Sequence, residues 1–135
     1  MPIMTWDASL DIGVTAMNRE HQEILDAMNR IYDAKAQGVS GSAVNDMVAR
    51  LGSVCVRHFA DEEAYMKQVG YPELQRHIQL HARLLDQFSG HAAAIKAAGG
   101  APNDEFFHFL KFWLTSHIKG IDIKYSEHAR AQGVA

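Results

Sequence analysis

Apolar side chains recur at helical spacing in four stretches of the chain, 13–37, 42–69, 73–98 and 103–120. In the first stretch, Met17, Ile24, Met28 and Ile31 follow one another at intervals of three, four or seven residues. Such intervals match the turn of an α-helix and place the side chains on one face. An alternation of period two is nowhere sustained, so we predict four amphipathic helices and an all-α fold.

Three short clusters of helix-breaking residues separate these stretches, at 38–42, 70–72 and 99–102. Loops as short as these favour antiparallel neighbours, so we predict an up-down-up-down antiparallel four-helix bundle. Residues 1–11 lack a clear period and are expected to form an N-terminal arm, and the short C-terminal tail after about Arg130 is expected to fray. We expect residues 1–135 to form a single domain.

Composition narrows the classes of partner. The 135 residues are 47% hydrophobic, which suits one domain with its own core, and the formal net charge of −3 leaves no basic surface for nucleic acid. Cys55 is the only cysteine, so a disulfide framework and a thiolate-rich metal site are excluded. No leader-like start and no apolar run approaching ~20 residues is found, so we expect a cytoplasmic protein without membrane insertion.

Seven side chains that can ligate metals lie within the predicted apolar faces. They are His21, His58, Glu62, His77, His81, His117 and Asp122. A buried imidazole or carboxylate without a partner costs several kcal/mol or shifts its pKa until it is neutral. Their place on faces that point to the core therefore predicts a shared partner.

Counting residues from the loops places these side chains in one layer. His21 and His58 lie equally far from the first loop, so an antiparallel pair of helices brings them level. The same count across the other two loops brings His77 and His81 level with the ligand residues of both neighbouring helices. The pairs His58/Glu62 and His77/His81 are each four residues apart, which puts their Cβ atoms ~5–6 Å apart on one helix face.

The step from His117 to Asp122 is irregular. Five residues separate the two, which is more than a regular helical turn aligns, and Gly120 lies between them. We predict a local break or a widened turn at this point.

Counting ligands predicts two metals. Two octahedral ions offer about twelve positions; five imidazoles, two bridging carboxylates and one bridging oxide or hydroxide leave one position for an exogenous ligand. Without thiolates the donors suit iron, with manganese, zinc or copper also possible. A dimetal centre with one open position indicates that a small molecule binds there.

The ligand spacings resemble those of the hemerythrin family, and specifically its bacterial single-domain type, the bacteriohemerythrins. The resemblance rests on His21, His58-xxx-Glu62, His77-xxx-His81 and His117-xxxx-Asp122, with Trp6 and Gly13 upstream, and it covers nearly the whole chain. It implies a four-helix bundle that holds two iron ions, bridged by an oxide or hydroxide, and binds dioxygen reversibly without being an enzyme.

The resemblance also implies a role for each ligand. His77, His81 and His117 would hold one iron, His21 and His58 would hold the other, and Glu62 and Asp122 would bridge the two. The residues that would line the oxygen pocket are Ile24, Phe59, Trp113 and Leu114, for which ordinary core packing is the alternative. The family commonly has Asp-x-Gln before the first histidine, whereas this chain has Asn18-Arg19-Glu20, so the partners of His21 differ.

Several other polar residues are expected to lie outside the site. His91 is ~15 Å along its helix from His81, His108 is expected on the surface, and His128 is expected to be solvated in the tail. Cys55 is interpreted as a small core residue. Tyr65 and Tyr125 could offer hydroxyl groups to the metal ligands.

Three functions remain open at this level. Reversible dioxygen binding for storage, transport or delivery is favoured, with an oxygen-consuming enzyme or a reductase as possible protein partners and a monomer as the expected state. The alternatives are a redox enzyme that acts on oxygen, peroxide or nitric oxide, and a module that senses oxygen or redox state. No substrate or reductase site is marked in the sequence, and we expect no output domain within these 135 residues.

Overall fold

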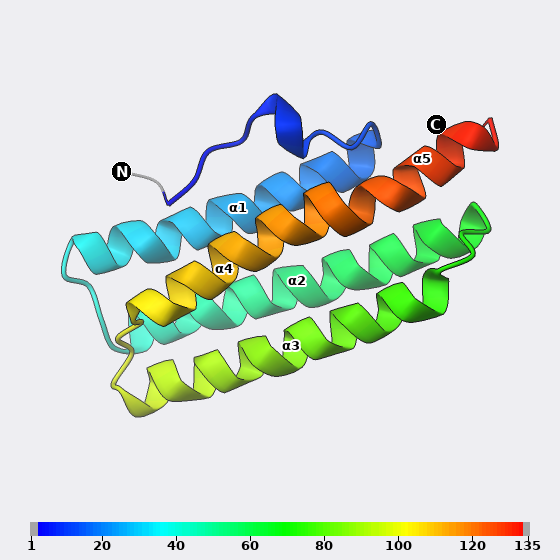
Figure 1. The fold of residues 1–135 in the computed structure, drawn as a ribbon. Coiled ribbons are helices and arrows are strands. Elements are labelled where there is room, and N and C mark those ends of the chain that lie inside the picture. Colours follow the sequence, from blue (N-terminus) through cyan, green and yellow to red (C-terminus); the bar gives the residue numbers. More distant parts are fainter. Residues whose placement is uncertain (1–2, 134–135) are drawn as a thin grey trace.

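The computed structural model describes residues 3–133 and confirms the all-α, antiparallel four-helix bundle (Figure 1). Its long helices run alternately up and down, and they are α1 (Thr15–Ala36), α2 (Ser42–Gln68), α3 (Leu74–Ala97) and α4 (Asp104–His117). The described residues contain no strand. The first three helices begin and end within two residues of the bounds expected from the apolar periodicity.

The fourth helix extends beyond residue 120, where the sequence prediction ended it. After α4 the chain passes through one π-helical turn, η2 (Ile118–Asp122), and continues as α5 (Ile123–Ala131). The expected end of the fourth helix at residue 120 is therefore wrong. Helix α5 ends at Ala131, next to Arg130, after which the tail was expected, and residues 134–135 lie outside the described residues. The helix continues past residue 120 because Tyr125, Ser126 and Ala129 of α5 pack into the bundle.

His128 is likewise not a solvated residue, as the sequence analysis expected. Its Nε2 lies 3.1 Å from the carbonyl oxygen of Val69, and its ring packs against Tyr71. This contact joins α5 to the end of α2 and explains why the last helical turns do not fray.

The N-terminal arm runs along α1 and contains one short 3₁₀ turn, η1 (Ala8–Leu10). The amide of Ile3 donates to Asn29 Oδ1 at 2.9 Å, and the Asn29 side-chain amide donates to the carbonyl of Met4 at 3.0 Å. Residues 1–2 of the expected arm lie outside the described residues. The arm therefore covers the outer side of α1 rather than extending from the bundle.

Two loops touch at one end of the bundle, where Gly100 follows α3 and Gly41 precedes α2. Gly100 has φ +79°, which L residues with a side chain rarely adopt. A Cβ atom at Gly100 would overlap the carbonyl oxygen of Gly41 and lie 2.5 Å from the Gly41 amide nitrogen. Glycine at position 100 therefore permits the two loops to pack backbone against backbone.

Candidate metal centre

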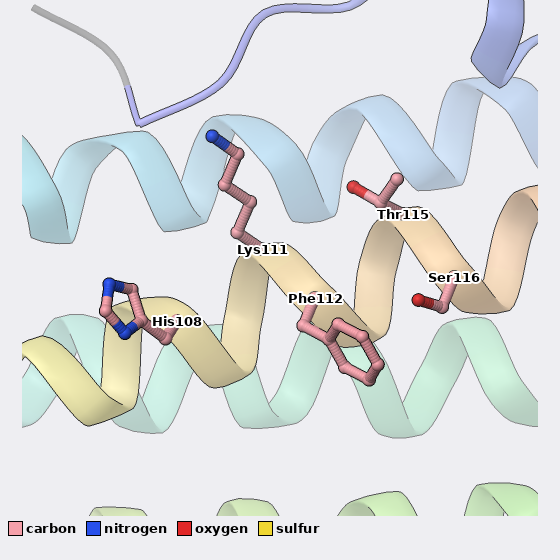
Figure 2. Close-up of a pocket in the computed structure, with 5 residues that line it drawn as sticks. All are labelled: His108, Lys111, Phe112, Thr115 and Ser116. Atoms are coloured by element: carbon pink, nitrogen blue, oxygen red, sulfur yellow. The ribbon is translucent and has the colours of Figure 1, made fainter.

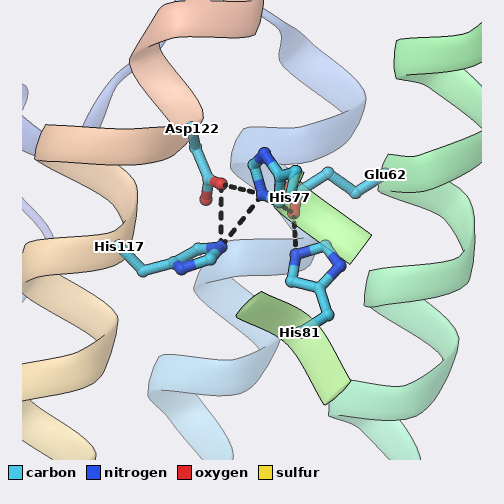
Figure 3. Close-up of side chains that lie close together, drawn as sticks. All are labelled: Glu62, His77, His81, His117 and Asp122. Carbon is cyan, nitrogen blue, oxygen red and sulfur yellow. Dashed lines mark hydrogen bonds and ion pairs between the residues drawn. The ribbon is translucent and has the colours of Figure 1, made fainter. Parts of the chain in front are cut away.

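The seven predicted ligands meet in one buried layer across the bundle. Each has a relative exposure of 4% or less, although a buried carboxylate or imidazole is unfavourable without compensation. Helix α1 supplies His21, and α2 supplies His58 and Glu62. Figure 3 shows the other side of the layer, where His77 and His81 of α3 face His117 at the end of α4 and Asp122 of η2.

The donor atoms form two groups that share both carboxylates. One group contains Glu62, His77, His81, His117 and Asp122, and the other contains His21, His58, Glu62 and Asp122. Within each group the potential ligand atoms all lie within 4.8 Å of one another. The geometry thus offers two adjacent sites, one with three imidazoles and one with two.

Each carboxylate turns one oxygen to each group. Glu62 Oε1 lies 2.9 Å from His81 Nε2, whereas Glu62 Oε2 lies 3.3 Å from His58 Nε2. Asp122 Oδ1 lies 3.1 Å from His77 Nε2, whereas Asp122 Oδ2 lies 3.2 Å from His21 Nε2. This is the arrangement that two bridging carboxylates require.

The π-helical turn brings Asp122 into the layer. A regular α-helix turns ~100° per residue, so a residue five positions after His117 would point well away from it. In η2 the amide of Ile123 instead bonds to the carbonyl of Ile118, five residues back, and one residue is thereby added to the turn. Asp122 Oδ1 then lies 3.1 Å from His117 Nε2, and the widened turn predicted at Gly120 is confirmed.

Several polar atoms of the layer are buried without a hydrogen-bond partner. Both ring nitrogens of His21, Nδ1 of His77 and both carboxylate oxygens of Asp122 are in this state. The Nε2 atoms of His77 and His117 also face each other at 3.1 Å, so both can donate a lone pair to one ion. Imidazole nitrogen and carboxylate oxygen are suitable ligands for iron, so the residues present fit a di-iron centre.

The two carboxylates set the charge of the layer. Burial favours neutral Glu62, but His58 and the other imidazoles outweigh it and hold the pKa of Glu62 well below its usual value. Burial alone would lower the pKa of His58, but Glu62 and Glu20 raise it to about 10. Burial would also lower the pKa of His77, but Asp122 and Glu62 raise it to about 9. Without metal, both imidazoles hold protons near neutral pH, so metal binding releases protons.

Two outer carboxylates, which sequence reasoning missed, orient two of the imidazoles. Nδ1 of His58 donates to Glu20 at 2.7 Å, and Nδ1 of His81 donates to Glu63 at 2.8 Å. The acid at position 20, where the family commonly has glutamine, thus faces His58 rather than His21. Their signal in the sequence is adjacency, since Glu20 precedes His21 and Glu63 follows Glu62.

Tyr125 supplies the hydroxyl group that the sequence analysis suggested. It donates to Glu62 Oε2 at 2.7 Å, and burial together with the Glu62 charge raises the pKa of its phenol, which keeps the phenol neutral. The hydroxyl of Tyr65 is buried without a hydrogen-bond partner, and its ring instead packs against Tyr125 at 5.6 Å.

We expect Glu20→Gln and Glu63→Gln each to weaken metal binding about 10- to 100-fold. A neutral amide accepts more weakly from the imidazole and leaves its ring less well oriented. Competition with a calibrated chelator would measure the affinity. Glu23→Gln is the matched control, because Glu23 is exposed and pairs only with Arg57. Equal affinities in all three variants would contradict the orienting role.

The four residues expected to line an oxygen pocket are all buried, and two of them lie beside the imidazoles. The ring of Phe59 stacks on His81 with centroids 3.9 Å apart, and Trp113 lies 6.2 Å from His117. Ile24 and Leu114 are core residues with 0% and 1% exposure.

The remaining histidines lie away from the layer. His108 is exposed on the outer face of α4, where it lines a shallow pocket with Phe112 (Figure 2). His91 stacks on Phe109 of α4 with ring centroids 4.7 Å apart, ten residues along α3 from His81. Cys55 is buried, and burial raises the pKa of its thiol to about 12, in agreement with a small core residue.

Comparison with known proteins agrees with this geometry. Residues 12–129 match the model of the hemerythrin HHE cation-binding domain. The chain belongs to the hemerythrin family. Hemerythrin-domain proteins bind a di-iron centre, which the His, Glu and Asp cluster suits, and hemerythrins and myohemerythrins are oxygen-binding proteins rather than enzymes.

Relatives in this family align over most of their length. Bacteriohemerythrin of Stenotrophomonas maltophilia is 27% identical over 97% of the chain and 84% of the relative. Myohemerythrin of Riftia pachyptila is 32% identical over 89% of the chain and 88% of the relative. A wild-type hemerythrin crystal structure superposes with a TM-score of 0.80, at 26% identity, over 92% of this chain and 95% of that one. No helix of residues 3–133 is both long and apolar enough to span a membrane.

Proposed function

We propose that this hemerythrin-family chain binds dioxygen reversibly at a carboxylate-bridged di-iron centre, for oxygen storage, transport or delivery. The observation that carries the proposal is the sharing of Glu62 and Asp122, each with one oxygen turned to each donor group. His77, His81 and His117 would hold one iron, and His21 and His58 would hold the other. A bound di-iron centre supplies the electrons and the open coordination position by which dioxygen is held.

The residues around the layer favour a neutral ligand. Phe59 and Trp113 lie beside the imidazoles, and both also line a small, wholly apolar pocket with Cys55 and Phe88 among α2, α3 and α4. Such a wall excludes water and disfavours charged species, while dioxygen dissolves readily in it. Tyr125 keeps Glu62 in place and stays neutral, so it does not act as a base.

An oxygen titration of the anaerobically reduced, iron-loaded protein tests the proposal. We expect a visible charge-transfer band that grows with dioxygen, disappears under argon and returns over repeated cycles. Oxidation within the first cycle without a reversible form would contradict oxygen carriage. Many turnovers of peroxide or nitric oxide with a reductant would favour the redox enzyme instead, and ligand-dependent binding to a signalling partner would favour the sensor.

We further propose a cytoplasmic monomer that supplies an oxygen-consuming enzyme or interacts with a reductase. The large hydrophobic side chains exposed among residues 3–133 come from three different segments: Val39 from the loop after α1, Val56 from α2 and Phe112 from α4. Light scattering of the metal-loaded protein should give the mass of one chain, and cell fractionation should place it in the cytoplasm. A dimer mass or recovery outside the cytoplasm would contradict these proposals.

A further inference from the structure

A pocket of about 380 Å³, lined by both polar and apolar side chains, opens beside His77, away from the apolar wall. The start of α3 forms one side with Arg76 and His77, and Lys124 of α5 lies on the other. Tyr71 and Glu73 complete the polar part of its lining. The π-helical turn also borders the pocket, so the feature that places Asp122 inside the bundle shapes this opening as well.

His77 offers a hydrogen-bond donor here that the protein does not satisfy. Its Nε2 faces Asp122 and His117 (Figure 3), so when Nε2 ligates a metal the ring proton is carried by Nδ1. Nδ1 is buried and has no hydrogen-bond partner among residues 3–133. By contrast, the Nδ1 atoms of His58 and His81 have carboxylate partners. The Nδ1 atom of His21 lacks a partner, as that of His77 does, but His21 does not line this pocket. A histidine whose other nitrogen ligates a metal normally donates to a carboxylate, a carbonyl or water.

Two cations face the same space without partners. Among residues 3–133, neither Arg76 nor Lys124 forms an ion pair, and both side chains are exposed. The first amides of α3 add partial positive charge, because the residue before the helix, Glu73, makes no side-chain cap to them. Glu73 is the one carboxylate on the pocket, against two cations and a buried N–H group.

We propose that this pocket binds a small oxoanion, a phosphate or a carboxylate, which accepts the hydrogen bond of His77 Nδ1 while Arg76 and Lys124 balance its charge. Charge-assisted bonds from guanidinium and ammonium groups are strong in a partly buried site. The anion would take the place at His77 that Glu20 takes at His58 and Glu63 takes at His81. Through His77 the anion would alter the electron donation to one iron and so adjust oxygen affinity. This effect on oxygen affinity rests on the proposed function, whereas anion binding itself does not.

Calorimetric titration of the iron-loaded protein with inorganic phosphate at constant ionic strength tests the pocket. We expect saturable binding to one site, about tenfold or more weaker in Arg76→Gln/Lys124→Gln and a few-fold tighter in Glu73→Gln, because these changes remove attraction and repulsion respectively. The matched control is Arg83→Gln/Lys111→Gln, which removes the same charge from exposed positions of α3 and α4. Its affinity should equal that of the unaltered protein.

Absence of saturable binding would overturn the proposal. Equal weakening in both double variants would indicate an adventitious ion only and would overturn it too. The oxygen titration separates the two proposals: reversible oxygen binding without phosphate binding contradicts the pocket alone. If phosphate binds as expected while oxygen does not bind reversibly, the pocket stands and the oxygen-carrier function fails.

Discussion

Glu62→Ala is expected to lower the iron content from about two ions per chain to about one or none. The reason is that Glu62 is within 3.5 Å of imidazoles from both donor groups, with one oxygen turned to each, so its removal deprives both sites of a ligand. Asp122→Ala should act in the same way. Iron and protein would be quantified after gel filtration, with helical content measured in parallel by circular dichroism.

Matched controls separate loss of a ligand from loss of charge. Asp46→Ala and Glu127→Ala remove exposed carboxylates from the same two regions, α2 and α5, and should keep the full iron content. Retention of two irons in Glu62→Ala or Asp122→Ala, with normal oxygen binding, would refute the bridging role. Glu62→Gln preserves side-chain volume, so iron loss in that variant would exclude a simple cavity effect.

Gly100→Ala is expected to destabilise the fold by about 3–5 kcal/mol and to lower the melting temperature by about 10–20 °C. The added Cβ would overlap the Gly41 backbone, which cannot move without separating two loops that hold the ends of α1, α2, α3 and α4. The left-handed backbone conformation adds about 1–2 kcal/mol. Thermal unfolding followed by circular dichroism measures the change.

Gly99→Ala provides the comparison. Gly99 has φ +74°, close to that of Gly100, but a Cβ atom there would meet nothing within 4 Å. It should therefore cost only the backbone conformation, about 1–2 kcal/mol. Equal melting temperatures for the two variants would show that the close approach of the loops contributes nothing to stability.

The sequence predicted the features that depend on helical period and loop position. His21 and His58 could be placed level because both lie equally far from one short loop, and the step from His117 to Asp122 could be identified as irregular by counting. The continuation into α5 was missed, although Ile121, Tyr125 and Ala129 repeat every four residues. The predicted stretch ended at Gly120, where a break or a widened turn was expected.

Partners that depend on the rotation of neighbouring helices could not be predicted. Glu20 lies next to His21 in the chain but accepts a hydrogen bond from His58 on another helix. The rotation of α1 relative to α2 decides which of the two imidazoles Glu20 contacts. A single sequence does not specify that rotation. The same holds for His128, whose carbonyl partner Val69 follows a different helix.

The π-helical turn has a consequence for how related chains should be aligned. On a regular helix, position 121 would lie on the same face as the side chains buried before the turn, such as Leu114 and Ile118. The buried positions after the turn are instead 122, 125 and 129. The last ligand is thus encoded in the length of a helix as well as in the identity of a residue. An alignment that ignores the extra residue of this turn would pair Asp122 with an outward-facing position. A chain that keeps all seven ligand types would then appear to lack one bridging carboxylate.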